Sequence, residues 1–158
     1  MSATPVIHAA GEGDKRWFYG GGVHTWKVRA EQTGGTFFMF EDEMTQGKMT
    51  PWHTHPDSDE MAYVLEGEIE VNIDGDQRIV GAGGMCMTPR GVPHSFRVLS
   101  PTCRMLAFHT PGASEAFYWG ASEPAGDEDG TVDFDRIRAI ATETGATNVL
   151  GPPPFARA

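Results

Sequence analysis

The stretch "MAYVLEGEIEVNIDGDQRIV", from Met61 to Val80, decides the fold class of this chain. From Ile69 to Ile73 every second residue is apolar, and the residues between are polar. In a β-strand this alternation turns one row of side chains toward a core and the other toward solvent. The pair Asp74-Gly75 then separates this run from a second one, which is a strong signal for a β-hairpin.

Runs of the same kind fill most of the chain. They are rich in β-branched and aromatic residues, and the 20 Gly and 11 Pro lie between them as turns. We expect strands within residues 34–44, 61–73, 77–89, 94–100 and 103–111. The sequence therefore predicts an all-β fold.

The apolar period changes near the C-terminus. One helical face there carries Phe134, Ile137, Ile140 and Ala141. Asp133 is a suitable N-cap and Gly145 a suitable helix end. We predict one short C-terminal helix that packs on the β body, preceded by an exposed acidic loop over residues 122–130.

Length and charge limit the possible classes of protein. The 158 residues suit a single domain, 1–158, with a core barrel at about 34–111, an N-terminal strand extension 1–33 and a C-terminal loop and helix 112–158. A net charge of −10 argues against nucleic acid and anionic membranes as partners. No leader-like segment and no long apolar window is present, so a soluble cytoplasmic protein is expected. We assign no chemistry to Cys86 and Cys103, which lie in apolar runs.

The stretch "TPWHTHPDSDE" contains a possible metal site. Residues two apart on a strand point to the same side about 6.6 Å apart, so His53 and His55 can reach one ion. The turn residues that follow allow Glu60 to return to the same point. A fourth ligand can come from His94, which follows a Pro-x-Gly-x-Pro bend. The alternative is that these are unrelated polar groups on a solvated surface.

The full spacing decides between these readings, because it resembles the two signature motifs of the cupin superfamily. Gly47-x5-His53-x-His55-x4-Glu60-x6-Gly67 matches the first motif, and Gly83-x5-Pro89-x-Gly91-x2-His94 matches the second. The resemblance implies an antiparallel jelly-roll barrel and a divalent metal held by His53, His55, Glu60 and His94. Val98 stands where the family often has Asn, which makes the pocket more apolar.

This ligand set suits an open, catalytic metal site. It lacks the thiolates that closed structural zinc sites favour. Four protein groups on a six-coordinate ion leave two positions for substrate or dioxygen. We expect one divalent transition metal, Fe, Ni, Mn, Co or Zn. Glu60 could act as a base toward a substrate hydroxyl, although a bound cation would lower its pKa and weaken it as a base.

An aromatic and methionine-rich lining is expected around the site. The candidate pocket residues are Phe38, Phe40, Trp52, Tyr63, Met87, Phe96 and Phe108. Such a lining suits a flat hydrophobic substrate. The alternative is that these side chains only fill the barrel interior. His109 could form a hydrogen bond near the site, whereas His8 and His24 are assigned no role.

The flanking segments narrow the resemblance. "GEGDKRWFYGG", "TWKVRAEQTGG", "FHTPGASEAFY" and "ETGATNVLGPPP" are similar to segments of single-domain bacterial quercetinase-like cupins. This implies a metal-dependent dioxygenase that cleaves a flavonol-like or other enolic or phenolic aromatic compound, with Glu60 as the catalytic base. The alternative is a non-redox metal cupin, an isomerase or lyase, or a cupin that binds a small molecule without turnover.

The expected partners are a small aromatic or enolic molecule, dioxygen and a second copy of the chain. Cupin barrels commonly pair through sheet edges, and pairing removes an exposed edge. We predict a homodimer in which the N-terminal segment is a candidate for crossing to the partner.

Overall fold

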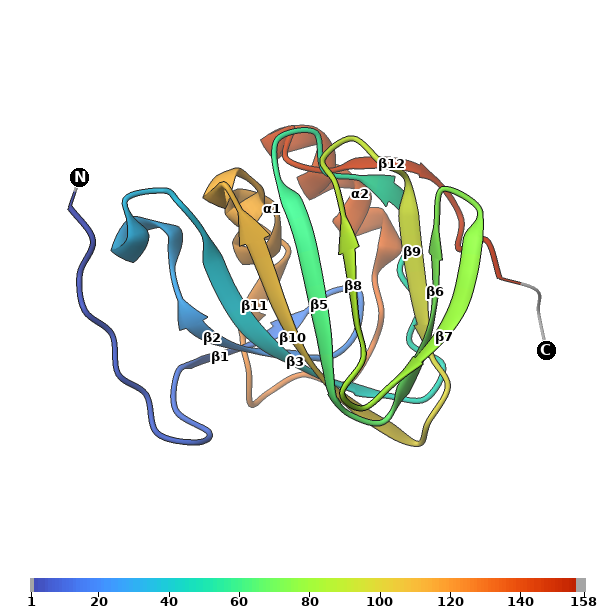
Figure 1. Cartoon of the computed structure of the whole chain (residues 1–158), viewed down its shortest axis with the longest axis horizontal. Helices are drawn as coiled ribbons and strands as arrows, with labels where there is room; N and C mark the ends of the chain where they lie inside the picture. Colours follow the sequence, from blue (N-terminus) through green and yellow to red (C-terminus); the bar gives the residue numbers. More distant parts are fainter. Residues whose placement is uncertain (1, 156–158) are drawn as a thin grey trace.

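Two antiparallel β-sheets face each other in a computed structural model that describes residues 2–155 (Figure 1). The seven-stranded sheet contains, in spatial order, β11 (Ser122–Pro124), β1 (Asp14–Phe18), β2 (Val23–Val28), β3 (Phe38–Thr45), β10 (Thr102–Thr110), β5 (Asp59–Glu66) and β8 (Met85–Thr88). The five-stranded sheet contains β12 (Asn148–Gly151), β4 (Trp52–Thr54), β9 (His94–Val98), β6 (Glu68–Ile73) and β7 (Asp76–Gly81). The helical segments are η1 (Ala30–Thr33), η2 (Gly112–Ser114), α1 (Glu115–Gly120) and α2 (Phe134–Thr144). The predicted all-β jelly-roll class is confirmed.

The predicted run 61–73 is two strands rather than one. The chain leaves the seven-stranded sheet as β5 and enters the five-stranded sheet as β6, with Gly67 between them at φ 86°. A side chain at Gly67 would collide with the carbonyl oxygen of Thr102. Only glycine combines this conformation with so close an approach, and its position therefore marks the corner of the sandwich.

The predicted hairpin at Asp74-Gly75 is confirmed. It joins β6 and β7, which pair from Ile73↔Asp76 to Glu68↔Gly81. Both turn residues have positive φ, 51° and 92°, as the two-residue turns that match strand twist require. The run 77–89 likewise divides, into β7 and β8, one strand in each sheet.

Side chains that point between the sheets form two apolar clusters. One cluster joins the N-terminal strands to the two helices and includes Phe38 and Phe40. The other fills the far end of the barrel around Val64 and Ile69. Residues alternate strictly along β10, so that Ala107 and His109 are buried while Phe108 between them faces outward. This alternation decides which predicted residues can reach a site inside the barrel.

The predicted C-terminal helix is confirmed as α2. The Asp133 side chain accepts from the backbone N–H of Arg136, and Gly145 has the left-handed conformation.

Three other elements of the C-terminal region, α1, β11 and β12, depart from the prediction. Helix α1 was not predicted. Ser122 lies buried in β11 and not in an exposed loop, because β11 pairs with the edge of β1.

The third departure is β12, which pairs with β4 and so places the C-terminal segment beside His53. The division into one domain with a barrel at 34–111 stays a prediction, and its ends at residues 1 and 156–158 lie outside the described residues. Within residues 2–155, no helix has the length and apolar character needed to cross a membrane.

Candidate metal centre and its cavity

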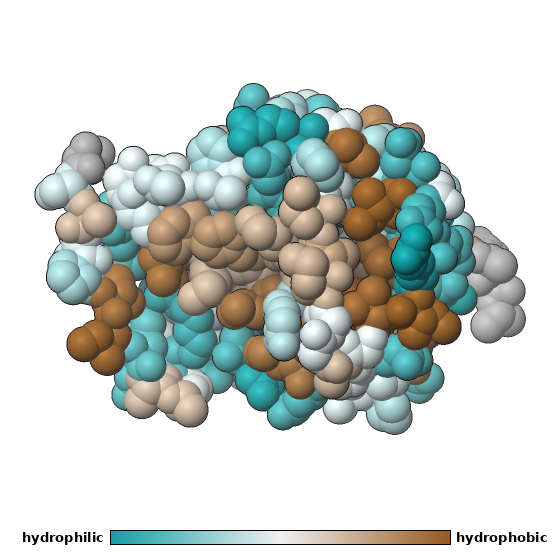
Figure 2. Space-filling view, in the orientation of Figure 1, coloured by the Kyte–Doolittle hydropathy of each residue, from teal (hydrophilic) through white to brown (hydrophobic). Residues whose placement is uncertain are grey.

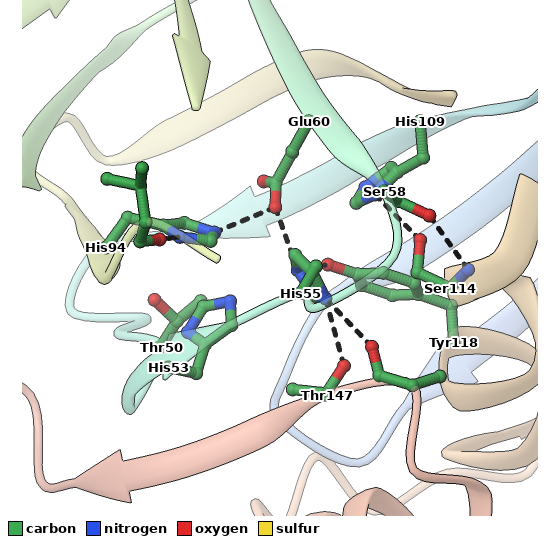
Figure 3. A network of polar contacts seen from close by, with 12 residues as sticks. Thr50, His53, His55, Ser58, Glu60, His94, His109, Ser114, Tyr118 and Thr147 are labelled. Carbon is green, nitrogen blue, oxygen red and sulfur yellow. Dashed lines mark hydrogen bonds and ion pairs between the residues drawn. The ribbon is translucent and has the colours of Figure 1, made fainter. Parts of the chain in front are cut away.

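The four predicted ligands meet between the two sheets (Figure 3). His53 and His94 are opposite each other in the β4–β9 pair, and His55 follows β4 directly. Glu60 comes from β5 of the other sheet. One ligand atom from each of the four residues lies within 4.8 Å of all the others. The turn between His55 and Glu60 thus carries the chain from one sheet to the other, across the site.

The Nδ1 atoms of the three histidines are all engaged away from the centre. Nδ1 of His53 lies 2.7 Å from the Pro51 carbonyl oxygen, and Nδ1 of His94 lies 3.0 Å from that of Val92. A carbonyl oxygen only accepts, so both Nδ1 atoms carry the proton and donate it. Nδ1 of His55 lies 3.0 Å from the Thr147 hydroxyl. Each ring therefore presents Nε2 to the centre, as metal-binding histidines held by an outer partner do.

The distances at the centre fit a bound cation. Glu60 Oε2 lies 2.9 Å from Nε2 of His55 and 2.9 Å from Nε2 of His94. A neutral His94 ring offers only a lone pair there, so a proton or a metal ion must separate it from the carboxylate. Ligands at right angles on an ion with bonds of about 2.0–2.2 Å lie about 3 Å apart. The donor set and its spacing therefore fit a divalent transition metal.

The electrostatics favour the metal-binding forms of His53 and Glu60, whereas His94 must release a proton before it can bind a metal. Burial, reinforced by His94 and His55, holds the pKa of His53 well below its usual value. Burial opposes ionisation of Glu60, but the His94 charge and hydrogen bonds from its histidine neighbours outweigh it and hold the pKa of Glu60 well below normal. Burial also works against a charged His94, yet Glu60 raises the pKa of that histidine. An ionised carboxylate beside neutral imidazoles is the state that binds a metal.

A cavity that opens to solvent adjoins the centre. His53, Glu60 and His109 form one part of its wall, and Phe40 and Phe96 form apolar parts. The C-terminal region supplies the remaining wall, because residues of α2 and β12 line the same cavity. Sequence reasoning assigned that region to packing only.

The structure places the predicted pocket residues in four different environments. Phe40 and Phe96 line the cavity, whereas Phe38 is fully buried beside it and stacks on His109. Trp52 is half-buried and lies outside the cavity lining. The outer face of the seven-stranded sheet carries Tyr63, Met87 and Phe108. The prediction of a pocket role is wrong for these last three, because each alternates with an inward-facing neighbour.

Sequence reasoning missed Tyr118 beside the centre, whereas it named His109 as a residue that could form a hydrogen bond near the site. The Tyr118 hydroxyl lies 3.0 Å from His55 Nε2, and burial, with Glu60 nearby, raises the pKa of Tyr118 well above normal. His109 is fully buried, with Nδ1 3.0 Å from the Ser114 hydroxyl and Nε2 without a partner among the described residues. Burial lowers the pKa of His109 to about 3, so the ring is neutral. His24, assigned no role from the sequence, is also fully buried and lines the cavity.

Comparison with known proteins agrees with this fold. The family described as "Cupin domain" matches residues 40–109. KdgF from Halomonas sp. superposes with a TM-score of 0.62 at 19% identity, covering 68% of this chain and 94% of that one. An RmlC-like cupin from Shewanella frigidimarina gives a TM-score of 0.60 at 19% identity, covering 70% of this chain and 95% of that one. The chain belongs to the cupin superfamily.

Among curated proteins, the chain is similar to quercetin 2,3-dioxygenase of Bacillus subtilis. The two are 31% identical over 108 residues, which cover 68% of this chain and 32% of that protein. The chain thus matches only about a third of the length of this relative. The chain resembles quercetinases within a superfamily whose members have many activities.

Proposed function

We propose that this cupin is a metal-dependent dioxygenase that cleaves flavonol-like or other enolic or phenolic aromatic compounds. The observation that carries the proposal is a three-histidine, one-carboxylate cluster that opens onto an aromatic-walled cavity. The similarity to quercetin 2,3-dioxygenase supports the same reaction class. One divalent ion, Fe, Ni, Mn, Co or Zn, is the expected cofactor.

His53, His55, His94 and Glu60 would hold the ion. When bound, the metal supplies a Lewis acid for an enolate oxygen and, if redox-active, electron transfer to dioxygen. The three rings act as fixed anchors, because each Nδ1 is engaged outside the centre. Phe40 and Phe96 give the cavity an apolar wall that excludes water from one side of the substrate.

Glu60 is the proposed base for the substrate hydroxyl. Its low pKa keeps it ionised and ready to accept a proton, but it also makes the carboxylate a weak base. Transfer is favourable only from a hydroxyl whose own pKa has been lowered by binding. Flavonols and other enols fit this requirement better than aliphatic alcohols, since their conjugate bases are delocalised.

The test is metal analysis followed by oxygen uptake. The purified chain is reconstituted with each of the five metals, and oxygen consumption is recorded with a flavonol and with a 1,3-diketone. We expect about one metal per chain, uptake with at least one redox-active metal, and loss of uptake with retained flavonol binding in Glu60→Gln. Absence of uptake with all five metals would contradict the proposal and favour a non-redox isomerase, lyase or binding protein.

We also propose that the chain forms a homodimer through the outer face of the seven-stranded sheet. Tyr63, Met85 and Met87 are about half exposed there, at 45%, 53% and 50%. Figure 2 shows apolar side chains across the middle of this face. β8 is the last strand of the sheet, so its outer edge pairs with no other strand within residues 2–155. A second copy would cover both features.

The N-terminal segment is the proposed crossing element. It runs extended before β1 and is tied to the body by the N–H of Thr4, which donates to the Gln32 carbonyl oxygen. Ile7 in this segment is 93% exposed. An apolar side chain held away from its own barrel is well placed to pack on a partner.

A further inference from the structure

A second polar cluster, apart from the candidate metal centre, lines the same cavity. Lys48 Nζ lies 2.8 Å from Asp42 Oδ2, and His24 Nε2 lies 3.5 Å from the same oxygen. All three side chains are at most 5% exposed, and all three residues line the cavity. None of the four candidate metal ligands contacts Lys48 through a hydrogen bond or ion pair among the described residues.

The cluster stands where an apolar residue would be expected. The inward row of β3 reads Phe38, Phe40, Asp42, Met44, and the carboxylate interrupts an otherwise apolar series. A buried ion pair is often no more stable than the apolar residues that could replace it. Gly22 leaves room for the pair: a Cβ there would lie 2.6 Å from Asp42 Oδ1 and 3.0 Å from Lys48 Nζ. Neighbouring residues are thus adapted to keep these charges.

The cluster also has hydrogen-bonding capacity that the described residues do not use. An ammonium group has three donors, and Asp42 is the only acceptor found for Lys48 within residues 2–155. Nδ1 of His24 and Oδ1 of Asp42 have no partner there either. Buried polar groups are normally satisfied, so an unsatisfied cluster on a cavity wall indicates a ligand or ordered water.

The route from this cluster to the metal centre is apolar and aromatic. The Lys48 ammonium lies 5.3 Å from the Phe18 ring and 5.8 Å from the Phe96 ring. Phe96 also lines a small adjoining pocket together with Glu60 and His94. One aromatic ring therefore adjoins both polar ends, an arrangement suited to a flat ligand with oxygen at each end.

We propose that Lys48, held by Asp42, binds a substrate oxygen at the end remote from the metal centre. The proposal rests on the proposed function and refines its substrate class. The preferred substrate is a flat aromatic molecule with a chelating enol or phenol at one end and a further hydroxyl or carbonyl oxygen at the other. Lys48 is then a specificity residue, because a buried donor rejects the analogue that leaves it unpaired.

The test compares ligands that differ only in the distal oxygen. The zinc-loaded chain, without dioxygen, is titrated with 3-hydroxyflavone and with its 4′-hydroxy and 7-hydroxy derivatives, and binding is followed by absorbance. We expect at least one derivative to bind about tenfold or more tightly than the parent compound. The double variant Lys48→Met/Asp42→Asn removes both charges and so leaves no lone buried charge. In it, the affinities for the preferred derivative and for the parent flavonol should differ by no more than about twofold, with metal content unchanged. Lys27→Met is the matched control and should keep the full preference.

A second measurement avoids the variants. In wild-type protein carrying ¹³C-labelled lysine, the Lys48 ε-methylene signal should shift with the preferred derivative and not with the parent flavonol. Equal affinity for all three ligands in the wild type, or a preference that survives in the double variant, would overturn the proposal and leave the cluster a structural ion pair. The binding result does not depend on turnover, because zinc is used and dioxygen is absent. Failure of the Lys48 proposal can therefore be distinguished from failure of the dioxygenase proposal, which the oxygen-uptake test measures.

Discussion

At the scale of single residues, the candidate centre depends on groups that never touch the metal. Thr147 holds Nδ1 of His55 from the C-terminal segment, with the Ala146 carbonyl oxygen a more distant partner at 3.4 Å. We expect Thr147→Val to weaken metal binding about tenfold, since loss of an outer hydrogen bond lets the ring turn. Competition with a chromogenic chelator measures the affinity. The control is Thr142→Val, an exposed threonine on α2, which should leave the affinity unchanged; equal affinities for all three proteins would contradict this role of Thr147.

Both cysteine thiols should react slowly with alkylating reagents in the folded chain. Burial, with Glu60 nearby, raises the pKa of Cys86 to about 11, and burial also raises that of Cys103. At pH 8 a thiol of pKa 11 is about one-thousandth thiolate, against roughly a quarter for an ordinary cysteine. We expect Cys86 in the folded, metal-free chain to react with iodoacetamide on the order of a hundredfold more slowly than in urea, as measured by peptide mass spectrometry. Rapid labelling of the folded chain would show that the thiol is activated.

The four candidate ligands could be selected from the sequence, but the residues that hold them in place could not. His53, His55, Glu60 and His94 form a local pattern whose spacing carries the geometry. Thr147 reaches the centre only through the pairing of β12 with β4, 92 positions along the chain from His55. The sequence does contain a signal for Asp42, because a carboxylate there interrupts the apolar row of β3. That signal indicates a buried charge, but it does not identify the residues that contact it.

At the scale of elements, α2 and β12 act as a wall of the cavity as well as a cover. The N-cap of α2 is Asp133, whose Oδ1 accepts from the N–H of Arg136 at 2.9 Å. Asp133→Ala should lower the free energy of unfolding by about 1 kcal/mol, because it removes this capping bond. Urea denaturation followed by tryptophan fluorescence measures the change. Asp135→Ala is the control, because it removes an acidic side chain from the same first turn and its exposed ion pair with Arg138 but no capping bond, and it should change stability by about 0.5 kcal/mol or less. Similar losses in both variants would contradict the capping assignment.

The elements that the sequence predicted correctly are those whose signals lie within a few residues of each other. The hairpin at Asp74-Gly75 and helix α2 each depend on residues within a few positions, and both are confirmed. The break at Gly67 was missed because an apolar alternation continues across it, and only the close approach of Thr102 requires the turn. β11 and β12 were missed because short edge strands form by pairing with distant partners, β1 and β4.

At the scale of the whole molecule, the misplaced pocket residues are informative. Tyr63, Met87 and Phe108 were assigned to the interior because they are apolar, yet they face outward. When both rows of a strand are apolar, alternation does not reveal which row faces the core. An outer row that is also apolar indicates that the outer face is covered in solution. The apolar outer row that contains Tyr63, Met87 and Phe108 thus supports the proposed dimer.

Met87 lies on the outer face of the edge strand β8, opposite Met61 of β5. We expect light scattering to give twice the chain mass of 17.2 kDa for the wild type and the single mass for Met87→Glu, because two symmetry-related carboxylates would be buried against apolar surface. The matched control is Ile79→Glu, which replaces a 61% exposed apolar residue on β7 of the other sheet and should remain dimeric. Added salt should strengthen the wild-type dimer, since each chain carries a net charge of −10. A wild type that stays at the single mass at high concentration and high salt, or a Met87→Glu variant that still pairs, would contradict a dimer formed through this face.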